Sequence, residues 1–434
     1  MPPQSPSAAA RDEPVIRDRG DACPGALRLH AADDGFLARV RIPAGMLDGH
    51  AAHLLADAAD RLGDGHIDLT SRGNAQLRGL GASCGGELQA VLVRAGLLPA
   101  PTHERVRNIV ASPLTGLDRR ALPDVAPWVA ELDRLLCASE PAAGLSGRFL
   151  FALDDGRGDV TSLAADVNLV ARDADRALLW TGDPADAVLV AATDGPRAAL
   201  TAAAQFLDAV REAGTRAWRV AELPPEHVPD SAGLVARLAA SGIEAVVVRG
   251  FASPRSHAPE PGVVEGPDGT AALSVLAPLG RLTTVQWRRL AGVTGRLRLT
   301  PWRGIVVPGL AAHAAERALA DLADAGLVTT PDDPWRSVSA CTGRPGCAKS
   351  LADVRADART VAAHATGPLP VHWSGCERRC GHPRGTAWVD VVATGAGYDL
   401  GAAGGSPRRG VQTSELPAAL VDARRTTSHD AAKK

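Results

Sequence analysis

Apolar and polar residues alternate in several short segments of the chain, and amphipathic helical segments separate them. Alternation predicts strands over residues 37–42 and 66–79, and strands are also expected over residues 149–153, 166–171, 187–191 and 245–248. Apolar positions three and four residues apart predict helices over residues 50–62, 90–98, 197–213 and 234–240. Residues 222–230 hold three prolines and few apolar residues, which makes them the best linker candidate. Strands and helices in repeated order favour an α+β fold whose sheets are covered on one face.

The pattern contains an internal repeat. Residues that follow Leu69 align with residues that follow Leu299 at a constant offset of 230, so that Gly79 matches Gly309 and Pro101 matches Pro331. The same offset places an alanine and a leucine opposite Cys341 and Cys347. We therefore expect two copies of one unit, of which only the second holds a metal, while the first binds or shapes a substrate.

Composition restricts the class of protein. At 434 residues, with 45% hydrophobic and 22% charged residues, the chain is long enough for two or three domains. A net charge of −2 argues against a nucleic-acid partner, and no apolar run is long enough to span a membrane. Residues 1–20 predict a disordered lead-in without a secretory signal, which favours a cytoplasmic location, and residues 401–434 predict a flexible tail.

Four cysteines near the end of the chain carry the strongest chemical signal. Cys341, Cys347, Cys376 and Cys380 form a C-x5-C pair, a gap of 28 residues and a C-x3-C pair. Thiolates at this spacing favour an iron-sulfur cluster, because structural zinc usually takes tighter C-x2-C or C-x4-C pairs. Zinc and inert core cysteines remain alternatives, and a reducing compartment makes disulfides improbable.

A second signal is a row of polar side chains in the predicted strand 66–79. The even positions Arg72, Asn74, Gln76 and Arg78 share one face at a spacing of about 7 Å. Such a row suits several carboxylates of one large ligand, whereas the alternative is the solvated face of an antiparallel sheet.

Further residues extend this candidate substrate site. They are Arg107 and Asn108, together with Arg148, Trp302 and Arg303. In the internal repeat, Arg107 and Asn108 occupy the position that mirrors the loop of Cys341 and Cys347. Arg107 and Asn108 would add anion contacts or form an ordinary basic loop. A tryptophan can wall a flat ligand by stacking, although it is more often part of a core. No catalytic residue identifies itself.

Segments 69–79, 107–114, 341–347 and 374–381 together resemble the nitrite and sulfite reductase superfamily, over about residues 22–395. The resemblance implies two ferredoxin-like halves forming one shared domain, two further α+β domains, and a 4Fe-4S cluster beside sirohaem. It places the halves at residues 21–88 and 231–312, and the α+β domains at 89–230 and 313–400. By this likeness the four cysteines bind the cluster, and Arg72, Asn74, Gln76, Arg78 and Arg107 face the tetrapyrrole.

The chain also departs from the reductases. Where sulfite-reducing relatives place two alternating lysines, this sequence has Arg148 and Leu150, so one cation is lost. Residues 299–309 and the short length are more similar to the precorrin-3B synthases, the cobalamin-pathway branch of the superfamily. That branch hydroxylates precorrin-3A with oxygen and closes a lactone, using the cluster and a non-haem iron.

The resemblance therefore implies precorrin-3A and oxygen as substrates and an NADH-linked or ferredoxin-like electron donor. Two alternatives stay open. One is a sulfite or nitrite reductase that depends on sirohaem, and the other is a noncatalytic tetrapyrrole-binding electron-transfer protein.

Overall fold

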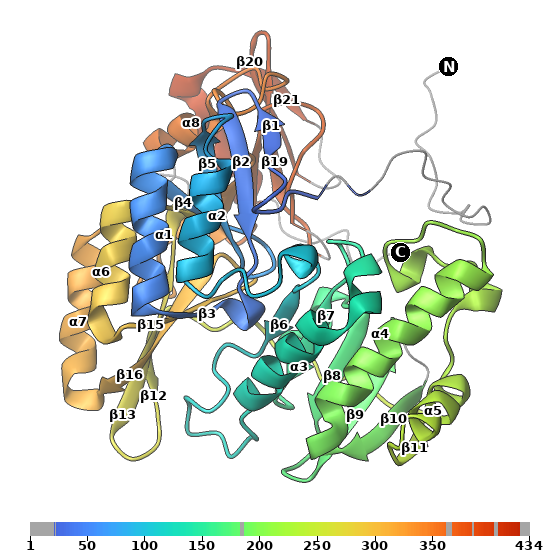
Figure 1. Cartoon of the computed structure of the whole chain (residues 1–434). Helices are drawn as coiled ribbons and strands as arrows, with labels where there is room; N and C mark the ends of the chain where they lie inside the picture. Colours follow the sequence, from blue (N-terminus) through green and yellow to red (C-terminus); the bar gives the residue numbers. More distant parts are fainter. Residues whose placement is uncertain are drawn as a thin grey trace.

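The computed structural model describes residues 21, 23–182, 186–361, 367–383, 386–402 and 407–425 of the chain. These residues form four sheets with helices packed on them (Figure 1), which confirms the predicted α+β class. In this part of the chain no helix combines the length and the apolar character needed to cross a membrane.

The first half-unit is a five-stranded sheet covered on one face by two helices. Its strand order is β1 (His30–Ala32), β2 (Gly35–Val40), β5 (Ala75–Leu80), β4 (His66–Leu69) and β14 (Arg281–Thr283). Helices α1 (Gly49–Leu62) and α2 (Gly85–Arg94) pack on it. The Asp48 carboxylate begins α1 by accepting a hydrogen bond from the backbone of Ala51.

The second half-unit repeats this arrangement. Its strand order is β12 (Gly262–Glu265), β13 (Thr270–Leu276), β16 (Gly304–Ala311), β15 (Arg296–Leu299) and β3 (Met46–Asp48). Helices α6 (Thr284–Thr294) and α7 (Ala312–Asp324) pack on it. Each half lends a short strand to the other sheet, and α1 packs on α6, where Trp287 donates to the carbonyl of Ala52. The halves therefore share one core, as the resemblance implied.

The first α/β unit is a six-stranded sheet in the order β11 (Ala245–Arg249), β10 (Asp186–Ala191), β9 (Arg176–Thr181), β8 (Val167–Ala171), β7 (Phe151–Asp154) and β6 (Ile109–Ala111). Helices α3 (Ala126–Ala138), α4 (Gly195–Glu212) and α5 (Ser231–Ala240) pack on it. The sequence assigned α5 and β11 to the second half, but β11 pairs with β10 and completes this sheet. The proline-rich segment 222–230 is therefore a turn within this unit, and the second half begins after β11.

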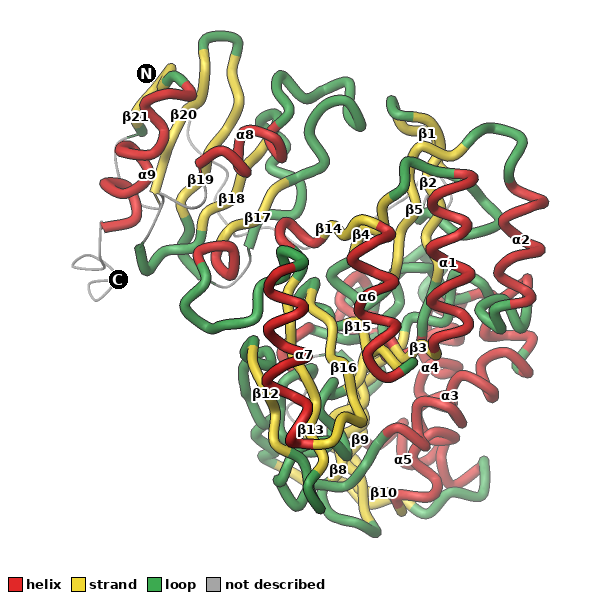
Figure 2. Tube along the Cα trace, turned by 90° about the vertical axis from the view of Figure 1, so that its left-hand side faces the viewer, coloured by secondary structure: helices red, strands yellow, loops and turns green. Residues whose placement is uncertain are grey.

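The cysteine unit (residues 334–425) holds the fourth sheet, in the order β17 (Val338–Ala340), β18 (Val371–Ser374), β19 (Val389–Thr394), β20 (Gly397–Ala402) and β21 (Arg408–Val411). Helices α8 (Val354–Val361) and α9 (Leu416–Arg425) complete it. Figure 2 shows this unit beside β4 and β14.

The prediction of a flexible tail from residue 401 was wrong for β21 and α9. Leu416, Ala419 and Leu420 recur at helical spacing and are buried in the core of the cysteine unit, which orders this segment. Residues 426–434, like the predicted lead-in 1–20, lie outside the described residues.

The single strand predicted over residues 66–79 is a hairpin of β4 and β5. Thr70 begins the turn, because its backbone N–H donates to the carbonyl of Asn74 at 2.9 Å and its hydroxyl accepts from the N–H of Asn74 at 3.1 Å. Gly73 has φ +64°, and a Cβ there would lie 2.8 Å from the carbonyl oxygen of Leu299. Arg72 therefore lies in a turn between the strands and not in a strand.

Candidate functional site

The polar face of the first sheet is the face opposite α1 and α2. Ala38, Leu77 and their neighbours point into the helix-covered core, so the alternating residues of β2 and β5 point the other way. Arg39 lies opposite Gln76 in the ladder and donates to its side-chain oxygen at 3.0 Å. Asn74 accepts from the backbone of Ile42 at 2.9 Å. The predicted polar row therefore exists from Asn74 to Arg78.

Three guanidinium groups gather where this face meets the first α/β unit. The carbonyl of Gly147 accepts from Arg41 at 3.3 Å, from Arg72 at 3.2 Å and from the Asn108 amide at 2.6 Å. Arg39 lies beside them on β2. Among the described residues, neither Arg39, Arg41 nor Arg72 forms an ion pair with a carboxylate. We call these three side chains the arginine cluster.

The electrostatics of the arginine cluster are those of a receptor for anions. Arg41 is 3% exposed, and burial, with repulsion from Arg39 and Arg72, lowers its pKa to about 9. Burial lowers the pKa of Arg72 to about 10. Nε of Arg39 and one terminal nitrogen of Arg41 are buried without a hydrogen-bond partner. Buried cations without a counter-ion are costly, and an anionic ligand would supply one.

Sequence reasoning missed Arg39 and Arg41. The signal was present, because both residues stand at alternate positions of the predicted strand 37–42, with the same period as Asn74, Gln76 and Arg78. The pairing of β2 with β5, which brings the two rows onto one face, is not visible in the sequence.

Two predicted ligand-binding arginines are already paired inside the fold. Arg78 makes two bonds of 2.9 Å to Asp34 and a third of 2.9 Å to the carbonyl of Gly346. Arg107 makes two bonds of 2.7 Å to Asp133 and one of 2.9 Å to the carbonyl of Leu97. Both arginines are 4% exposed. Contact of either arginine with a ligand stays a prediction. In the structure, each binds a carboxylate and a backbone carbonyl of the chain itself.

The turn of the second half reaches both neighbouring units. Trp302 packs against an apolar group of the first α/β unit that includes Leu150, which is 3% exposed. Arg303 points the other way, because its terminal nitrogen lies 3.5 Å from the Cβ position of Gly381 beside Cys380. Burial and the nearby Arg355 lower the pKa of Arg303.

Arg148 lies in the loop before β7 and not in the arginine cluster's hydrogen-bond network. Its guanidinium carbon is 4.9 Å from the ring centroid of Trp218, which is a cation–π contact. Arg148, which stands in place of one of the two lysines of the sulfite-reducing relatives, is thus stacked on an aromatic ring. Contact of Arg148 with substrate stays a prediction.

The cysteines lie at one edge of the fourth sheet. Strands β17 and β18 are parallel, so their carboxyl ends meet, and Cys341 follows the first while Cys376 follows the second after one glycine. The Cys341 sulfur accepts from the backbone N–H of Gly375 at 3.2 Å. The N–H of Leu351 donates to the carbonyl of Gly375 at 2.8 Å, which ties the loop of Cys347 to the loop of Cys376. Burial raises the pKa of the Cys341 thiol, and the nearby Cys380 and Cys376 raise it further.

This donor set fits an iron-sulfur cluster. Sulfur ligands with backbone N–H bonds are the usual surroundings of such clusters, and Ser374 offers a buried hydroxyl without a partner beside them. Gly375 leaves no room for a side chain, since a Cβ would lie 1.9 Å from the Ser350 hydroxyl. In the described residues no three or more His, Cys, Asp or Glu side chains are arranged to hold a single metal ion. A 4Fe-4S cluster takes one thiolate at each iron, so its ligands stand farther apart than those of one ion.

The two histidines that flank the last cysteines have structural contacts. His372 is fully buried, which lowers its pKa to about 4, and its ring nitrogens lie 2.9 Å from the Ser339 hydroxyl and 3.2 Å from the carbonyl of Cys380. A neutral His372 thus donates to the backbone of Cys380. His382 stacks on Trp388 with ring centroids 4.9 Å apart.

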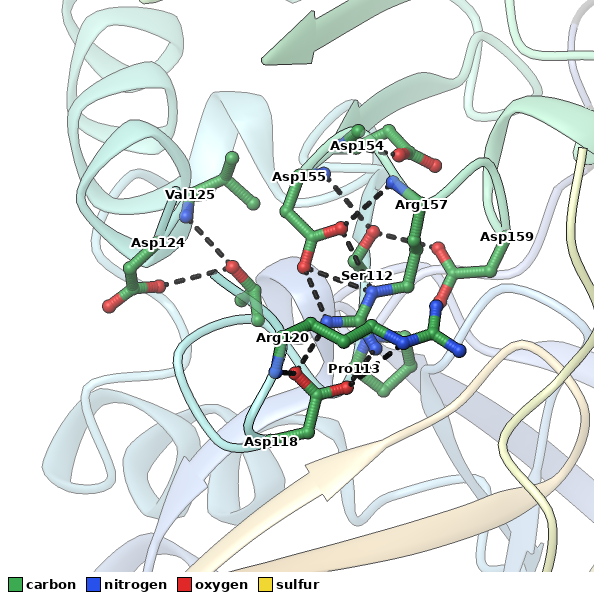
Figure 3. Close-up of polar contacts among 12 residues, drawn as sticks. Ser112, Pro113, Asp118, Arg120, Asp124, Val125, Asp154, Asp155, Arg157 and Asp159 are labelled. Atoms are coloured by element: carbon green, nitrogen blue, oxygen red, sulfur yellow. Dashed lines mark hydrogen bonds and ion pairs between the residues drawn. The ribbon is translucent and has the colours of Figure 1, made fainter. Parts of the chain in front are cut away.

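The first α/β unit has the same parallel edge with different chemistry (Figure 3). Ser112 follows β6 and donates to Asp159 at 2.7 Å, while Asp155 pairs with Arg157 at 2.7 Å. Burial and the nearby Asp154 raise the pKa of Asp159 to about 7. The sequence did not reveal this network, although four acidic or basic residues lie at positions 154–159, directly after the strand predicted over residues 149–153. Its side chains brace two loops of the unit.

Comparisons with known proteins agree with this architecture. The model of the nitrite/sulfite reductase ferredoxin-like half domain matches residues 29–84 and 264–325, one segment in each half. The chain is 27% identical over 418 residues to a precorrin-3B synthase of Sinorhizobium sp, covering 94% of this chain and 88% of that protein. It is 28% identical over 397 residues to the ferredoxin–nitrite reductase of Synechococcus elongatus, covering 80% and 74%.

A solved structure shares the fold. The Mycobacterium tuberculosis NirA protein superposes with a TM-score of 0.68 at 20% sequence identity, covering 88% of this chain and 79% of that one. The predicted fold class, with two ferredoxin-like halves in one shared domain, is thereby confirmed. The chain is thus similar to members of the nitrite/sulfite reductase superfamily in sequence and in its repeated half domain, as the resemblance implied.

Proposed function

We propose that this chain is a precorrin-3B synthase, which converts precorrin-3A to precorrin-3B by oxygen-dependent hydroxylation with lactone formation. The observation that carries the proposal is the arginine cluster. A large, polyacidic tetrapyrrole supplies several carboxylates at once, which suits three neighbouring, partly buried guanidiniums that form no direct ion pair with a carboxylate of the described residues. The likeness to the Sinorhizobium synthase over nearly the whole chain supports the same reading.

The chain's own residues would divide the work. Arg41 and Arg72 would bind substrate carboxylates, and Asn108 would orient the edge of the macrocycle beside them. Trp302 and the apolar group around Leu150 would cover part of the macrocycle and keep water away from it. Positioning of this kind selects which edge of the ring reacts.

The four cysteines would hold a 4Fe-4S cluster, which supplies electrons when bound. A ferredoxin-like or NADH-linked donor would reduce it, and the name of the Synechococcus relative supports the first. The predicted non-haem iron finds no ligand set of three His, Cys, Asp or Glu side chains in the described residues, so no step is assigned to it.

The decisive experiment is a mass measurement. Anaerobically purified protein is incubated with precorrin-3A and reductant, and then exposed to oxygen labelled with 18O. The proposal expects a product heavier by one labelled oxygen atom, and the sample kept without oxygen is the control. An unchanged mass in the presence of a reduced cluster would remove the proposal.

A second candidate is a nitrite or sulfite reductase that depends on sirohaem, which the similarity to nitrite reductases favours. Leu150 weakens it, because a buried leucine gives no charge to a small anion where reductases use lysine. The visible absorption bands of sirohaem in the purified protein, together with consumption of nitrite or sulfite, would establish this candidate instead.

A further inference from the structure

Three contacts join the first half-unit to the loop that carries Cys341 and Cys347. We call residues 341–350 the cysteine loop. Most of its residues belong to no helix or strand, so contacts outside the loop must fix its course. Those contacts reach backbone atoms of the loop, which makes them insensitive to the identity of its side chains.

The first contact runs through Asp68 on β4. Asp68 is 6% exposed and accepts from Arg355 at 3.0 Å and from Arg281 at 3.1 Å. Arg355, at the start of α8, also donates through Nε to the carbonyl of Cys341 at 3.2 Å. One guanidinium therefore bridges the polar sheet face and the backbone of a predicted cluster ligand.

The second and third contacts run through β5 and the turn between β1 and β2. Arg78 is fixed by Asp34 and donates to the carbonyl of Gly346, the residue before Cys347. Asp33 accepts from the backbone N–H of Ala348, the residue after it. A Cβ on Gly346 would lie 2.7 Å from Arg78 and 2.8 Å from Asp34, so the approach depends on this glycine.

We propose that Asp68, Arg355 and Arg78 are positioning residues that hold the cysteine loop against the polar face of the first half-unit. The inference rests on the proposed cluster, and it assigns Arg78 to the loop and not to a substrate carboxylate. Arg78 shares β5 with Gln76, which accepts from Arg39, so one strand connects the cysteine loop to the arginine cluster. The loop's position relative to a bound macrocycle is then set by this strand.

The geometry explains why a guanidinium is used for the first contact. Arg355 bonds two acceptors with two different nitrogens, which the single ammonium of lysine cannot do in the same orientation. Arg355→Lys should therefore keep the attraction to Asp68 and lose part of the hold on Cys341. Arg355→Gln should lose the charge and most of both bonds.

Hydrogen–deuterium exchange of the full chain tests the proposal without any need for activity. In Arg355→Gln and in Asp68→Asn, peptides covering the cysteine loop should exchange at least about tenfold faster than in the parent, while peptides of β13 and β16 stay unchanged. Arg355→Lys should lie between. Asp57→Asn is the matched control, because Asp57 pairs with Arg288 on the surface of the helices and touches no part of the loop.

A second readout is the spectroscopy of the bound cluster. The electron paramagnetic resonance signal of the reduced cluster should change shape in Arg355→Gln and partly return in Arg355→Lys, and chelators should remove iron several-fold faster. Unchanged loop exchange in both Asp68→Asn and Arg355→Gln would overturn the proposal. If Arg355→Gln loses its circular dichroism signal, Asp68→Asn decides alone. Faster loop exchange in a protein that binds no cluster would leave the positioning role standing and remove the proposed function.

Discussion

Replacing Arg72 by glutamine should separate ligand binding from folding. Among the described residues the side chain of Arg72 makes one hydrogen bond, of 3.2 Å, to the Gly147 carbonyl that Arg41 and Asn108 also bond. Loss of that bond should cost about 1 kcal/mol or less of the free energy of unfolding, because the acceptor keeps two donors. Removal of a charge that repels Arg41 offsets part of that cost.

The effect on ligand binding should be larger. A hydrogen bond between a guanidinium and a ligand carboxylate contributes about 1.5–3 kcal/mol, which corresponds to about a 10- to 150-fold increase in Kd when it is lost. The assay is an anaerobic absorbance titration with precorrin-3A, beside urea unfolding of the same variant without ligand.

Arg107→Gln is the matched contrast. It removes a bidentate ion pair and leaves the carboxylate of Asp133, of which 20% is exposed, without its partner. The free energy of unfolding should fall by about 2–4 kcal/mol. If Arg72→Gln, correctly folded, binds precorrin-3A within twofold of the parent, the arginine cluster is not the ligand site. If Arg107→Gln folds with parental stability and loses binding, Arg107 does not stabilise the fold through Asp133 and binds the ligand instead.

Three further substitutions test other parts of the structure. Cys380→Ser should remove one cluster ligand, so iron and sulfide content and visible absorbance should fall, and parental contents would contradict the assignment. Gly375→Ala should also lower cluster content, since its Cβ would lie 1.9 Å from the Ser350 hydroxyl, and Gly375→Ala with Ser350→Gly should recover it; parental iron content in the single variant would show that the loop yields. Asp159→Asn should stabilise the protein relative to the parent as pH rises, because a pKa raised to about 7 from an ordinary 3.8 means that the unfolded chain loses its proton first. The parent's stability then falls between about pH 4 and 7, by at most about 1.4 kcal/mol per unit, and the difference levels off above 7. Urea unfolding from pH 5 to 8, with the exposed Asp268→Asn as control, should show this rise, and a difference independent of pH would refute it.

The sequence predicted regular elements well because their periods are local. The helices α1 and α4 and the strands β2, β8 and β10 lie within two residues of their predicted bounds. The turn between β4 and β5 was not predicted, because its polar residues continue the alternation of the strands on either side. The assignment of α5 and β11 failed for a different reason, since strand pairing decides which sheet a helix-strand pair joins.

The sequence could predict that the chain has a site rich in arginine, but it could not predict which arginines belong to that site. Nothing local distinguishes Arg72, without a carboxylate partner, from Arg107, whose partner Asp133 lies 26 residues away on a helix. Arg78 is likewise paired with Asp34, 44 residues earlier. A row of arginines in a sequence therefore indicates an anion site only once the acids of the folded chain have been assigned to their partners.

The duplicated fold offers two equivalent edges at the carboxyl ends of parallel strands, and the chain uses them for opposite purposes. After β17 and β18 the edge carries Cys341 and Cys376, whereas after β6 and β7 it carries Ser112, which donates to the carboxylate of Asp159. Carboxylate oxygens are hard ligands, so the first α/β unit has little to offer a soft metal cluster. It contributes the Gly147 carbonyl instead, which gathers the cationic side chains. Under the proposed function this separation is favourable, because the thiolates of a cluster and the carboxylates of a large anionic ligand would repel each other if they shared one edge.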